Sequence, residues 1–250
     1  MNKKLQAYGN LCSLFYDTVE AYAPEHEVSF YASFMDKDSR VLEAMSGSGR
    51  LQIPLLQRGY QVDGVDSSAH MLERCRQRCA ALHLTPTLYQ QSLEEFSTEH
   101  NYKTVTIAIA SFQLIVDRAA ALSALKNLHA HMVEGGDLLI DIFVPDVQTG
   151  YQSTRIAHVD SHTIIRLTTY YVMHQQEQIV EAFCIYELMV DGIVLQEEQE
   201  LIRLVWYTDL DLTTLLEQAG FEVVKIYEES FREASPSRIV HARAVFKKSR

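Results

Sequence analysis

Along the first 145 residues, hydrophobic positions alternate between two patterns, which are short continuous apolar runs and longer segments with helical spacing. Short apolar runs cover residues 40–45, 61–65, 87–91, 104–110 and 138–144. Segments with helical spacing separate these runs, and this alternation predicts parallel strands joined by helices that cover both faces of one sheet. The run at 104–110 is apolar throughout, which is typical of a strand buried on both faces.

The helical segments have recognisable ends. Residues 1–36 predict two helices, which Pro24 separates. Ser67 or Ser68 caps a helix that runs to about Leu82. The spacing therefore predicts short connections between strand and helix in this half of the chain.

Two more helices are predicted by their caps. One begins after Asp117 and is expected to end at Gly135-Gly136, because leucines recur on one face of this segment. The other begins at Thr208, with Asp211 three residues later as its capping-box partner. The last strands are expected after this helix, over 221–226 and 239–246.

The pattern changes after Pro145. Residues 162–207 show no helical period, and two β-rich runs flank Asp191-Gly192, a strong hairpin signal. A third β-rich run precedes them. The sequence therefore predicts a three-stranded antiparallel meander within an insertion over about 147–207.

Composition narrows the class of protein. The net charge is −11, which disfavours a general nucleic-acid-binding function, and 47% of the residues are hydrophobic, enough for a large core. No apolar stretch is long enough to span a membrane, and the first ten residues lack the apolar core of a secretory signal. Four cysteines without a disulfide pattern favour the cytoplasm.

No metal site is predicted. Cys75 and Cys79 share one helix face, but no further Cys or His pair accompanies them. We interpret both as packing residues, since a free cysteine behaves as a small hydrophobic side chain.

Candidate chemistry gathers where the strands end. In an open parallel sheet, ligands bind beyond the carboxyl ends of the strands. The segment Glu43–Arg50 (EAMSGSGR) follows the first strand and Asp66 ends the second. Glycines permit a tight turn and a close approach of the backbone to a ligand, and a carboxylate at the next strand tip can accept both hydroxyls of a ribose. Together they predict a nucleoside site.

The nucleoside is left open by these residues alone. An NAD loop would have a third glycine where Gln52 stands, so a pyrophosphate on the helix terminus is disfavoured. A plain structural turn and a non-catalytic ligand sensor are also consistent with these residues.

Five motifs in order resemble class I S-adenosylmethionine-dependent methyltransferases: VLEAMSGSGR, VDGVDSSAHML, QSLEEF, SFQLI and LHAHMVEGGDLLIDIF. The similarity covers roughly residues 8–250. It is closest to the small-molecule branch with a β-rich insertion, which includes sugar-amine N-methyltransferases. The resemblance implies a Rossmann-like, doubly wound, mostly parallel seven-stranded sheet. It also implies one methyltransferase domain over 1–250, in which 1–36 is a helical lid.

The resemblance implies a role for each motif. Glu43 and the backbone of 45–49 would hold the methionine part of the donor, S-adenosylmethionine, while Asp66 takes the ribose and Met71 covers the adenine. A tyrosine of the first helix would close over the donor. The residues expected at the donor are Tyr8, Tyr16, Glu43, Ala44, Met45, Ser46, Gly47, Gly49, Arg50, Asp66, Ser67, Met71, Ser92, Leu93 and Ser111.

Two positions depart from the family pattern. Met45 replaces the first glycine of the loop, and Ser92 stands where an aspartate usually bonds the adenine amino group. The backbone N–H of Leu93 is expected to compensate for the second change.

The acceptor is expected to be a small molecule, reached by in-line displacement in which positioning supplies most of the rate. Gln113 and Tyr16 are the catalytic candidates, and the substrate candidates are Gln113, Asp146, Tyr170 and Trp206, with Tyr171 and Tyr207 beside them. Gln113 has an alternative role in bracing its own loop, and the aromatic residues have one as the apolar face of the antiparallel sheet. That sheet also suggests a homodimer.

Overall fold

The computed structural model describes residues 9–143, 146, 149–229, 231 and 237–246. These residues form two compact units. The larger unit comprises the described parts of 22–144 and 206–250, and the smaller unit comprises those of 1–21 and 145–205.

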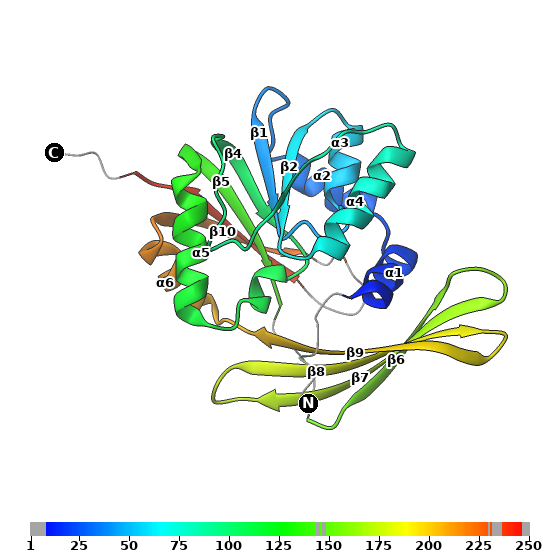
Figure 1. Cartoon of the computed structure of the whole chain (residues 1–250). Coiled ribbons are helices and arrows are strands. Elements are labelled where there is room, and N and C mark those ends of the chain that lie inside the picture. The colour runs from blue at the N-terminus through cyan, green and yellow to red at the C-terminus, as the bar shows by residue number, and fades with distance from the viewer. Residues whose placement is uncertain (1–8, 144–145, 147–148, 230, 232–236, 247–250) are drawn as a thin grey trace. The chain divides into compact units, whose positions relative to one another are not determined.

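A seven-stranded sheet forms the centre of the larger unit, in the order β10-β11-β5-β4-β1-β2-β3 (Figure 1). The strands β1 to β5 pair in parallel, whereas β11 runs antiparallel to both β5 and β10. This is the mostly parallel, doubly wound sheet that the sequence predicted. The strands are β1 Arg40–Ala44, β2 Gln61–Asp66, β3 Thr87–Gln90, β4 Tyr102–Ile107, β5 Met132–Ile142, β10 Phe221–Glu229 and β11 Ser237–Ala244.

Helices connect these strands and bury apolar faces against them. Val28 and Tyr31 of α2 join Leu55 of α3 in one core cluster with Val41 and Leu139 of the sheet. Figure 1 shows α5 and α6 beside β4, β5 and β10. The helices of this unit are α2 Glu25–Ala32, α3 Gln52–Gln57, α4 Ala69–Ala81, the 3₁₀ turn η1 Ser111–Leu114, α5 Arg118–Ala130 and α6 Asp209–Gln218.

The predicted caps are present. Ser68 accepts a hydrogen bond from the backbone of Met71, which settles the choice between Ser67 and Ser68. Asp117 caps α5 in the same way. Thr208 and Asp211 form a complete capping box at the start of α6. Each cap satisfies backbone N–H groups that the first turn of a helix leaves without a partner.

Two predicted boundaries are wrong. The strand expected over 104–110 ends at Ile107, because Ile109 and Ala110 take positive φ angles and turn the chain into η1. The helix expected to reach Gly135 ends at Ala130, and β5 begins at Met132. Leucines at helical spacing do not show where a helix ends when the next strand is equally apolar.

The smaller unit is a four-stranded antiparallel sheet with one helix against it. The strands are β6 Gln152–His158, β7 Thr163–His174, β8 Ile179–Val190 and β9 Ile193–Val205, so the prediction of three strands missed β6. Asp191 and Gly192 both have positive φ and form the predicted hairpin turn. Leu11, Cys12 and Phe15 of helix α1, Asn10–Val19, bury against this sheet.

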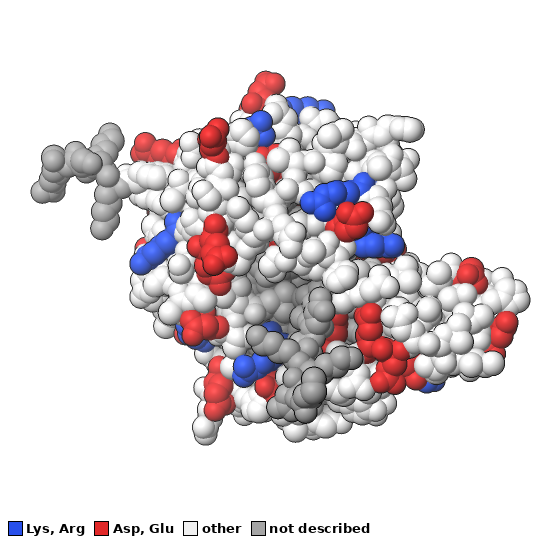
Figure 2. Space-filling view, viewed as in Figure 1, with Lys and Arg blue, Asp and Glu red and all other residues white. Residues whose placement is uncertain are grey.

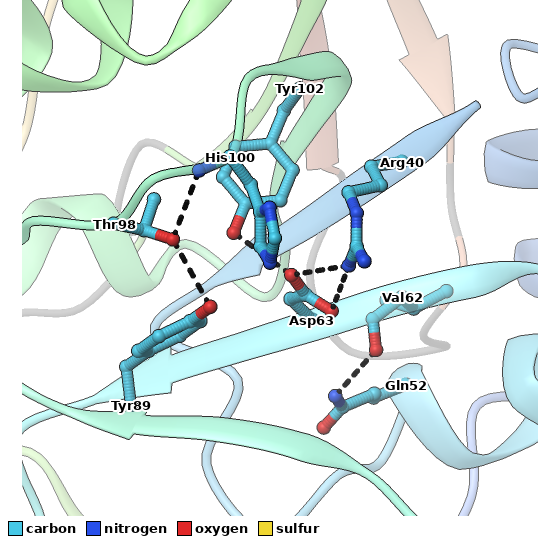
Figure 3. Close-up of polar contacts among 8 residues, drawn as sticks. All are labelled: Arg40, Gln52, Val62, Asp63, Tyr89, Thr98, His100 and Tyr102. Atoms are coloured by element: carbon cyan, nitrogen blue, oxygen red, sulfur yellow. Dashed lines mark hydrogen bonds and ion pairs between the residues drawn. The ribbon is translucent and has the colours of Figure 1, made fainter.

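A polar network lies in the sheet near the amino ends of the strands (Figure 3). The buried Asp63 of β2 accepts hydrogen bonds from Arg40 Nη1 at 3.2 Å and from Tyr102 Oη at 3.0 Å. The side chain of Gln52 donates to the carbonyl of Val62 at 3.0 Å. The contacts of Asp63 lie near the opposite end of the strands from residues 45–50, so Arg40 offers a control for experiments on that segment, whereas Gln52 lies just after it.

Among the described residues, no helix is long and apolar enough to cross a membrane. On the face drawn in Figure 2, acidic side chains are scattered between uncharged ones. This distribution agrees with the net charge of −11.

Candidate functional site

The segment 45–50, called the glycine loop below, makes a compact turn after β1. Its backbone is joined to β2 where the N–H of Ser46 donates to the carbonyl of Val65 at 3.0 Å. The N–H of Gly49 donates to the carbonyl of Ser46 at 3.0 Å, which closes the turn. Gly47 and Gly49 have φ angles of 56° and 83°, so this turn needs residues that tolerate positive φ.

Asp66 ties the glycine loop to the start of α4. One carboxylate oxygen accepts from the N–H of Gly47 at 2.9 Å, and the other accepts from the N–H of Ser68 at 2.8 Å. Burial raises the pKa of Asp66, and these two backbone hydrogen bonds oppose the rise. Each oxygen retains a lone pair, so the carboxylate can still accept from the two hydroxyls of a ribose.

Helix α4 packs directly under the loop. Arg78 donates to the carbonyl of Ser48 at 2.9 Å and stacks its guanidinium over the ring of Tyr22 at 4.5 Å. A Cβ added to Gly49 would lie 2.6 Å from the Sγ of Cys75. Gly49 is therefore required both by its φ angle and by the close approach of this helix.

Arg50 ends the loop in a buried ion pair. Its two terminal nitrogens donate to the two carboxylate oxygens of Glu27 at 2.8 and 2.7 Å. The N–H of Ala23 donates to the carbonyl of Arg50 at 2.9 Å. The side chain predicted at the donor thus fastens the loop to α2, and bidentate pairs of this kind fix geometry strongly.

Glu43 lies at the end of β1, directly before the loop. It is buried, and its Oε2 has no hydrogen-bond partner among the described residues. Burial raises the pKa of Glu43 to about 8, against a smaller lowering by Arg50. A buried carboxyl with an unused oxygen suits a cationic ligand group, which would supply the missing hydrogen bond.

Met45 takes the left-handed conformation that a glycine adopts without cost. Its φ is 59° and its side chain is half-buried. Left-handed backbone costs a residue with a Cβ roughly 1–2 kcal/mol. The loop therefore keeps the shape of a glycine loop at this position, with backbone strain.

The residues expected to hold the adenine lie at the start of α4 and in the turn after β3. Met71 is buried in the first turn of α4, and Leu93 is buried in the turn that follows β3. Asn127 of α5 donates to the carbonyls of Leu93 and Phe96 at 2.8 and 2.7 Å, which holds that turn in place. Ser92 is half-buried at its start.

Gln113 occupies a different place from the one expected of an acceptor contact. It is fully buried; its amide nitrogen donates to the carbonyl of Phe143 at 2.9 Å, and its amide oxygen accepts from the N–H of the same residue at 2.8 Å. These contacts match the alternative role, in which Gln113 braces the loops after β4 and β5. Ser111 is half-buried at the start of η1.

An aromatic group lies beside η1. Phe112 stacks on Tyr207 at 5.8 Å between ring centroids, and the guanidinium of Arg118 lies 4.8 Å from the Tyr207 centroid. The Tyr207 hydroxyl is buried without a hydrogen-bond partner in the described part of the chain, and burial raises its pKa to about 12. Trp206 is half-buried next to it.

Three predicted residues belong to the smaller unit. Tyr16 is half-buried and packs edge-to-face on Phe15 in α1. Tyr170 is exposed on β7, and Asp146 is exposed. Their roles at the donor or the acceptor stay predictions. Tyr8 lies outside the described residues.

Sequence reasoning missed Glu27, Tyr31 and Arg78 as parts of this site. Glu27 and Tyr31 are four residues apart and so share one face of α2, but the sequence does not show which strand ends that face covers. Helix α4 carries several arginines, and the sequence does not show which of them contacts the glycine loop. No group of three His, Cys, Asp or Glu side chains in the described regions has the geometry of a metal site.

Comparison with known proteins agrees with this arrangement. Residues 41–136, which run from β1 into β5 and include the glycine loop, match the family model of the methyltransferase domain. The matched residues include Glu43, the glycine loop and Asp66. The chain is 23% identical over 198 residues to a protein of Geobacillus sp. (strain WCH70) that is named as a methyltransferase by inference. The aligned part covers 79% of each chain.

Solved structures show that the chain has the class I fold of the S-adenosylmethionine-dependent methyltransferases. The sugar N-methyltransferase KedS8 of Streptoalloteichus sp. ATCC 53650 aligns with a TM-score of 0.77 at 16% identity, covering 96% of this chain and 95% of that one. The CcbJ methyltransferase of Streptomyces caelestis aligns with a TM-score of 0.75 at 21% identity, covering 96% and 98%. The match confirms the family resemblance and disfavours the NAD alternative.

Proposed function

We propose that this S-adenosylmethionine-dependent methyltransferase transfers the donor's methyl group to an amine of a small molecule, bound beyond the carboxyl ends of β4 and β5. The observation that carries the donor site is the glycine loop joined to Asp66 at the tip of β2. Its backbone turn and its carboxylate are in the places that a nucleoside with an attached amino acid requires.

The donor pose follows from the polar groups that remain available. Asp66 accepts from the ribose hydroxyls while it keeps the N–H groups of Gly47 and Ser68. Glu43 accepts from the ammonium of the methionine arm through its unused oxygen. Met71 and Leu93 enclose the adenine from α4 and from the turn after β3.

Positioning supplies most of the rate in this mechanism. The sulfonium is already an activated leaving group, so the chain must hold a neutral amine in line with the methyl–sulfur bond at near-attack distance. Gln113 acts indirectly, because its two hydrogen bonds to Phe143 fix the loops after β4 and β5 against each other. No general base is required once the amine is bound in its neutral form.

An amine of a sugar is the first acceptor to test. KedS8 is described as a sugar N-methyltransferase and CalS10 of Micromonospora echinaspora as an amino pentose methyltransferase, and both share this fold. On this chain, the half-buried Trp206 next to Tyr207 offers an apolar surface for such an acceptor. The buried Tyr207 hydroxyl offers one hydrogen bond to a polar acceptor group.

The decisive experiment separates donor binding from catalysis. Calorimetry with S-adenosylmethionine, S-adenosylhomocysteine and NAD is expected to give heat with the first two ligands only. Turnover is then measured on amino sugars and on matched sugars that carry a hydroxyl in place of the amine. Donor binding without turnover on any acceptor would favour a non-catalytic sensor, and turnover on the hydroxyl sugars would refute the amine proposal.

The insertion supports a homodimer proposal. One face of the four-stranded sheet is covered by α1, whereas Ile156, Tyr170, Val172 and Leu201 are exposed and lie by register on its other face. These apolar side chains lie among the ion pairs Arg166–Glu187 and Arg203–Glu181, and such a mixed face favours a second copy of the chain as its cover. Light scattering at micromolar concentration is expected to give a dimer mass, and Ile156→Lys with Leu201→Lys is expected to give a monomer.

A cytoplasmic location is part of the same proposal. All four cysteines are buried and unbonded, as is usual in a reducing compartment. Fractionation of cells that express the tagged chain is expected to recover it with cytoplasmic markers.

A further inference from the structure

A row of polar side chains crosses the sheet under α2. Register places Glu43 of β1 beside Thr106 of β4, and Thr106 beside Leu139 of β5. Asp141 follows Leu139 by two residues and so shares this sheet face. Tyr31 of α2 packs on the same face. Glu43 Oε2, Thr106 Oγ1 and Tyr31 Oη are buried and have no hydrogen-bond partner within the described residues.

Glu43 faces charged and titratable groups from every element around it. Arg50 of the glycine loop is the cation that lowers the pKa of Glu43, but Glu27 of α2 already engages its guanidinium through two hydrogen bonds. Asp66 at the end of β2 and Glu27 add negative charge, and a backbone hydrogen bond comes from Gln52.

Three further titratable groups lie in this part of the molecule: one is a carboxylate, and the other two are neutral at pH 7. Cys75 of α4 interacts with Glu43, and Asp141 of β5 faces Tyr31 together with Glu27 and Glu43. Burial raises the pKa of the Cys75 thiol and of the Tyr31 hydroxyl, so both are neutral at pH 7. Glu27 and Asp66 therefore raise the pKa of Glu43, Asp141 and Glu27 raise that of Tyr31, and Arg50, which Glu27 engages, lowers both.

This arrangement keeps Glu43 protonated before the donor arrives. Burial raises its pKa to about 8, and Arg50 opposes the rise only in part. A protonated carboxyl cannot form an ion pair with an ammonium group. When the donor's ammonium binds beside Glu43, it favours the ionised carboxylate, because its positive charge stabilises the buried negative charge.

We propose that binding of the donor releases one proton from Glu43, and that Arg50, held by Glu27, is the positioning residue that sets the pH range of this release. In this step the O–H bond of the Glu43 carboxyl breaks, the proton goes to solvent, and the carboxylate accepts a hydrogen bond from the donor's ammonium. The inference rests on the donor site of the proposed function and adds its linkage to protons.

Calorimetry at pH 7 in buffers of different ionisation enthalpy counts the released protons. S-adenosylmethionine and S-adenosylhomocysteine are each expected to release close to one proton. 5′-Methylthioadenosine, which lacks the amino acid arm, is expected to bind without release. The affinity for S-adenosylhomocysteine is expected to rise about tenfold between pH 6 and 7, as release of one proton requires.

The outcomes separate this inference from the function it rests on. Absence of binding by both adenosyl ligands overturns the donor site itself. Binding with no proton release, or equal release with 5′-methylthioadenosine, overturns the inference and leaves the donor site standing.

Two variants with opposite effects test Arg50. Arg50→Gln removes the cation and is expected to move the pH midpoint of donor affinity upward by about one unit. Glu27→Gln frees the guanidinium to act on Glu43 and is expected to move the midpoint downward. Structural damage alone would not move the two midpoints in opposite directions, so shifts of the same sign overturn the role of Arg50.

Controls complete the design. Glu43→Gln is expected to bind the donor more weakly and to release no proton. Arg40→Gln removes an equivalent guanidinium from Asp63 at the far end of the strands (Figure 3) and is expected to leave the midpoint unchanged. A shift in this variant equal to that of Arg50→Gln would overturn the assignment.

Discussion

At the scale of the residue, the sequence predicted where several residues of the proposed donor site lie relative to the strand ends. Glu43, Gly47 and Asp66 could be named because each lies at or just after the end of a predicted strand, and this is visible along the sequence. Glu27 could not, because its partner Arg50 is 23 positions away and only tertiary packing brings them together. Likewise, the two hydrogen bonds of Gln113 to Phe143 depend on how β4 and β5 pair.

Met45 gives the first residue-scale prediction. Because it has a φ of 59°, Met45→Gly is expected to remove about 1 kcal/mol of backbone strain, which glycine's greater entropy in the unfolded chain partly offsets. Unfolding in urea is therefore expected to show equal or higher stability. Calorimetry is expected to show donor affinity within threefold of the original, and a tenfold loss would mean that the side chain contacts the donor.

Asp66 gives the second. Asp66→Ala is expected to leave the fold intact and to weaken donor binding by roughly 1–3 kcal/mol, because a charged hydrogen-bond acceptor is lost. The same change frees the N–H groups of Gly47 and Ser68. A donor analogue without the 2′-hydroxyl separates the effects. If Asp66 bonds the ribose, the variant discriminates less between donor and analogue than the original protein does.

At the scale of the element, existence was easier to predict than extent. The strands and α-helices of the larger unit were anticipated, but the 3₁₀ turn η1 was not, β4 ends three residues early and β5 begins six residues early. Hydrophobic periodicity does not record positive φ angles such as those of Ile109 and Ala110. The missed strand β6 has the polar, exposed composition of an edge strand, which gives a weak signal.

The packing of the glycine loop on α4 predicts the effect of one methyl group. Gly49→Ala places a Cβ against Cys75 Sγ at 2.6 Å and forces alanine to a φ of 83°. It is expected to destabilise the fold by about 3 kcal/mol, from overpacking and backbone strain together. Urea unfolding measures this cost.

Gly47→Ala is the matched control for this packing argument. It also has positive φ, but its nearest neighbour is Met71 Sδ at 4.0 Å, so only backbone strain of about 1 kcal/mol is expected. Adding Cys75→Ala to Gly49→Ala should relieve the contact with Sγ and leave the backbone strain and the contact with Ile53 Cγ1 at 3.1 Å. Equal costs for the two glycine variants would contradict the role of α4.

At the scale of the whole molecule, the donor site has a cost that the sequence did not show. Burial of Glu43 destabilises the fold, because a carboxyl with a pKa of about 8 favours the unfolded chain wherever the unfolded group ionises and the folded one does not. The folded group is the more protonated one between its ordinary pKa of 4.5 and about 8. The free energy of unfolding of the donor-free protein therefore decreases through that window as pH rises.

Glu43→Gln removes this dependence, since an amide resembles the protonated carboxyl and does not titrate. Urea unfolding of both proteins at pH 5, 6, 7 and 8 is expected to give a stability difference that grows in favour of the variant, by at most about 1.4 kcal/mol per pH unit. Asp66, whose pKa is also raised by burial, is present in both proteins and cancels in the difference. Saturating S-adenosylhomocysteine should reverse the order, because only the original protein gains the full ion pair with the ammonium. Parallel stability curves without ligand would show that Glu43 is ionised in the donor-free protein.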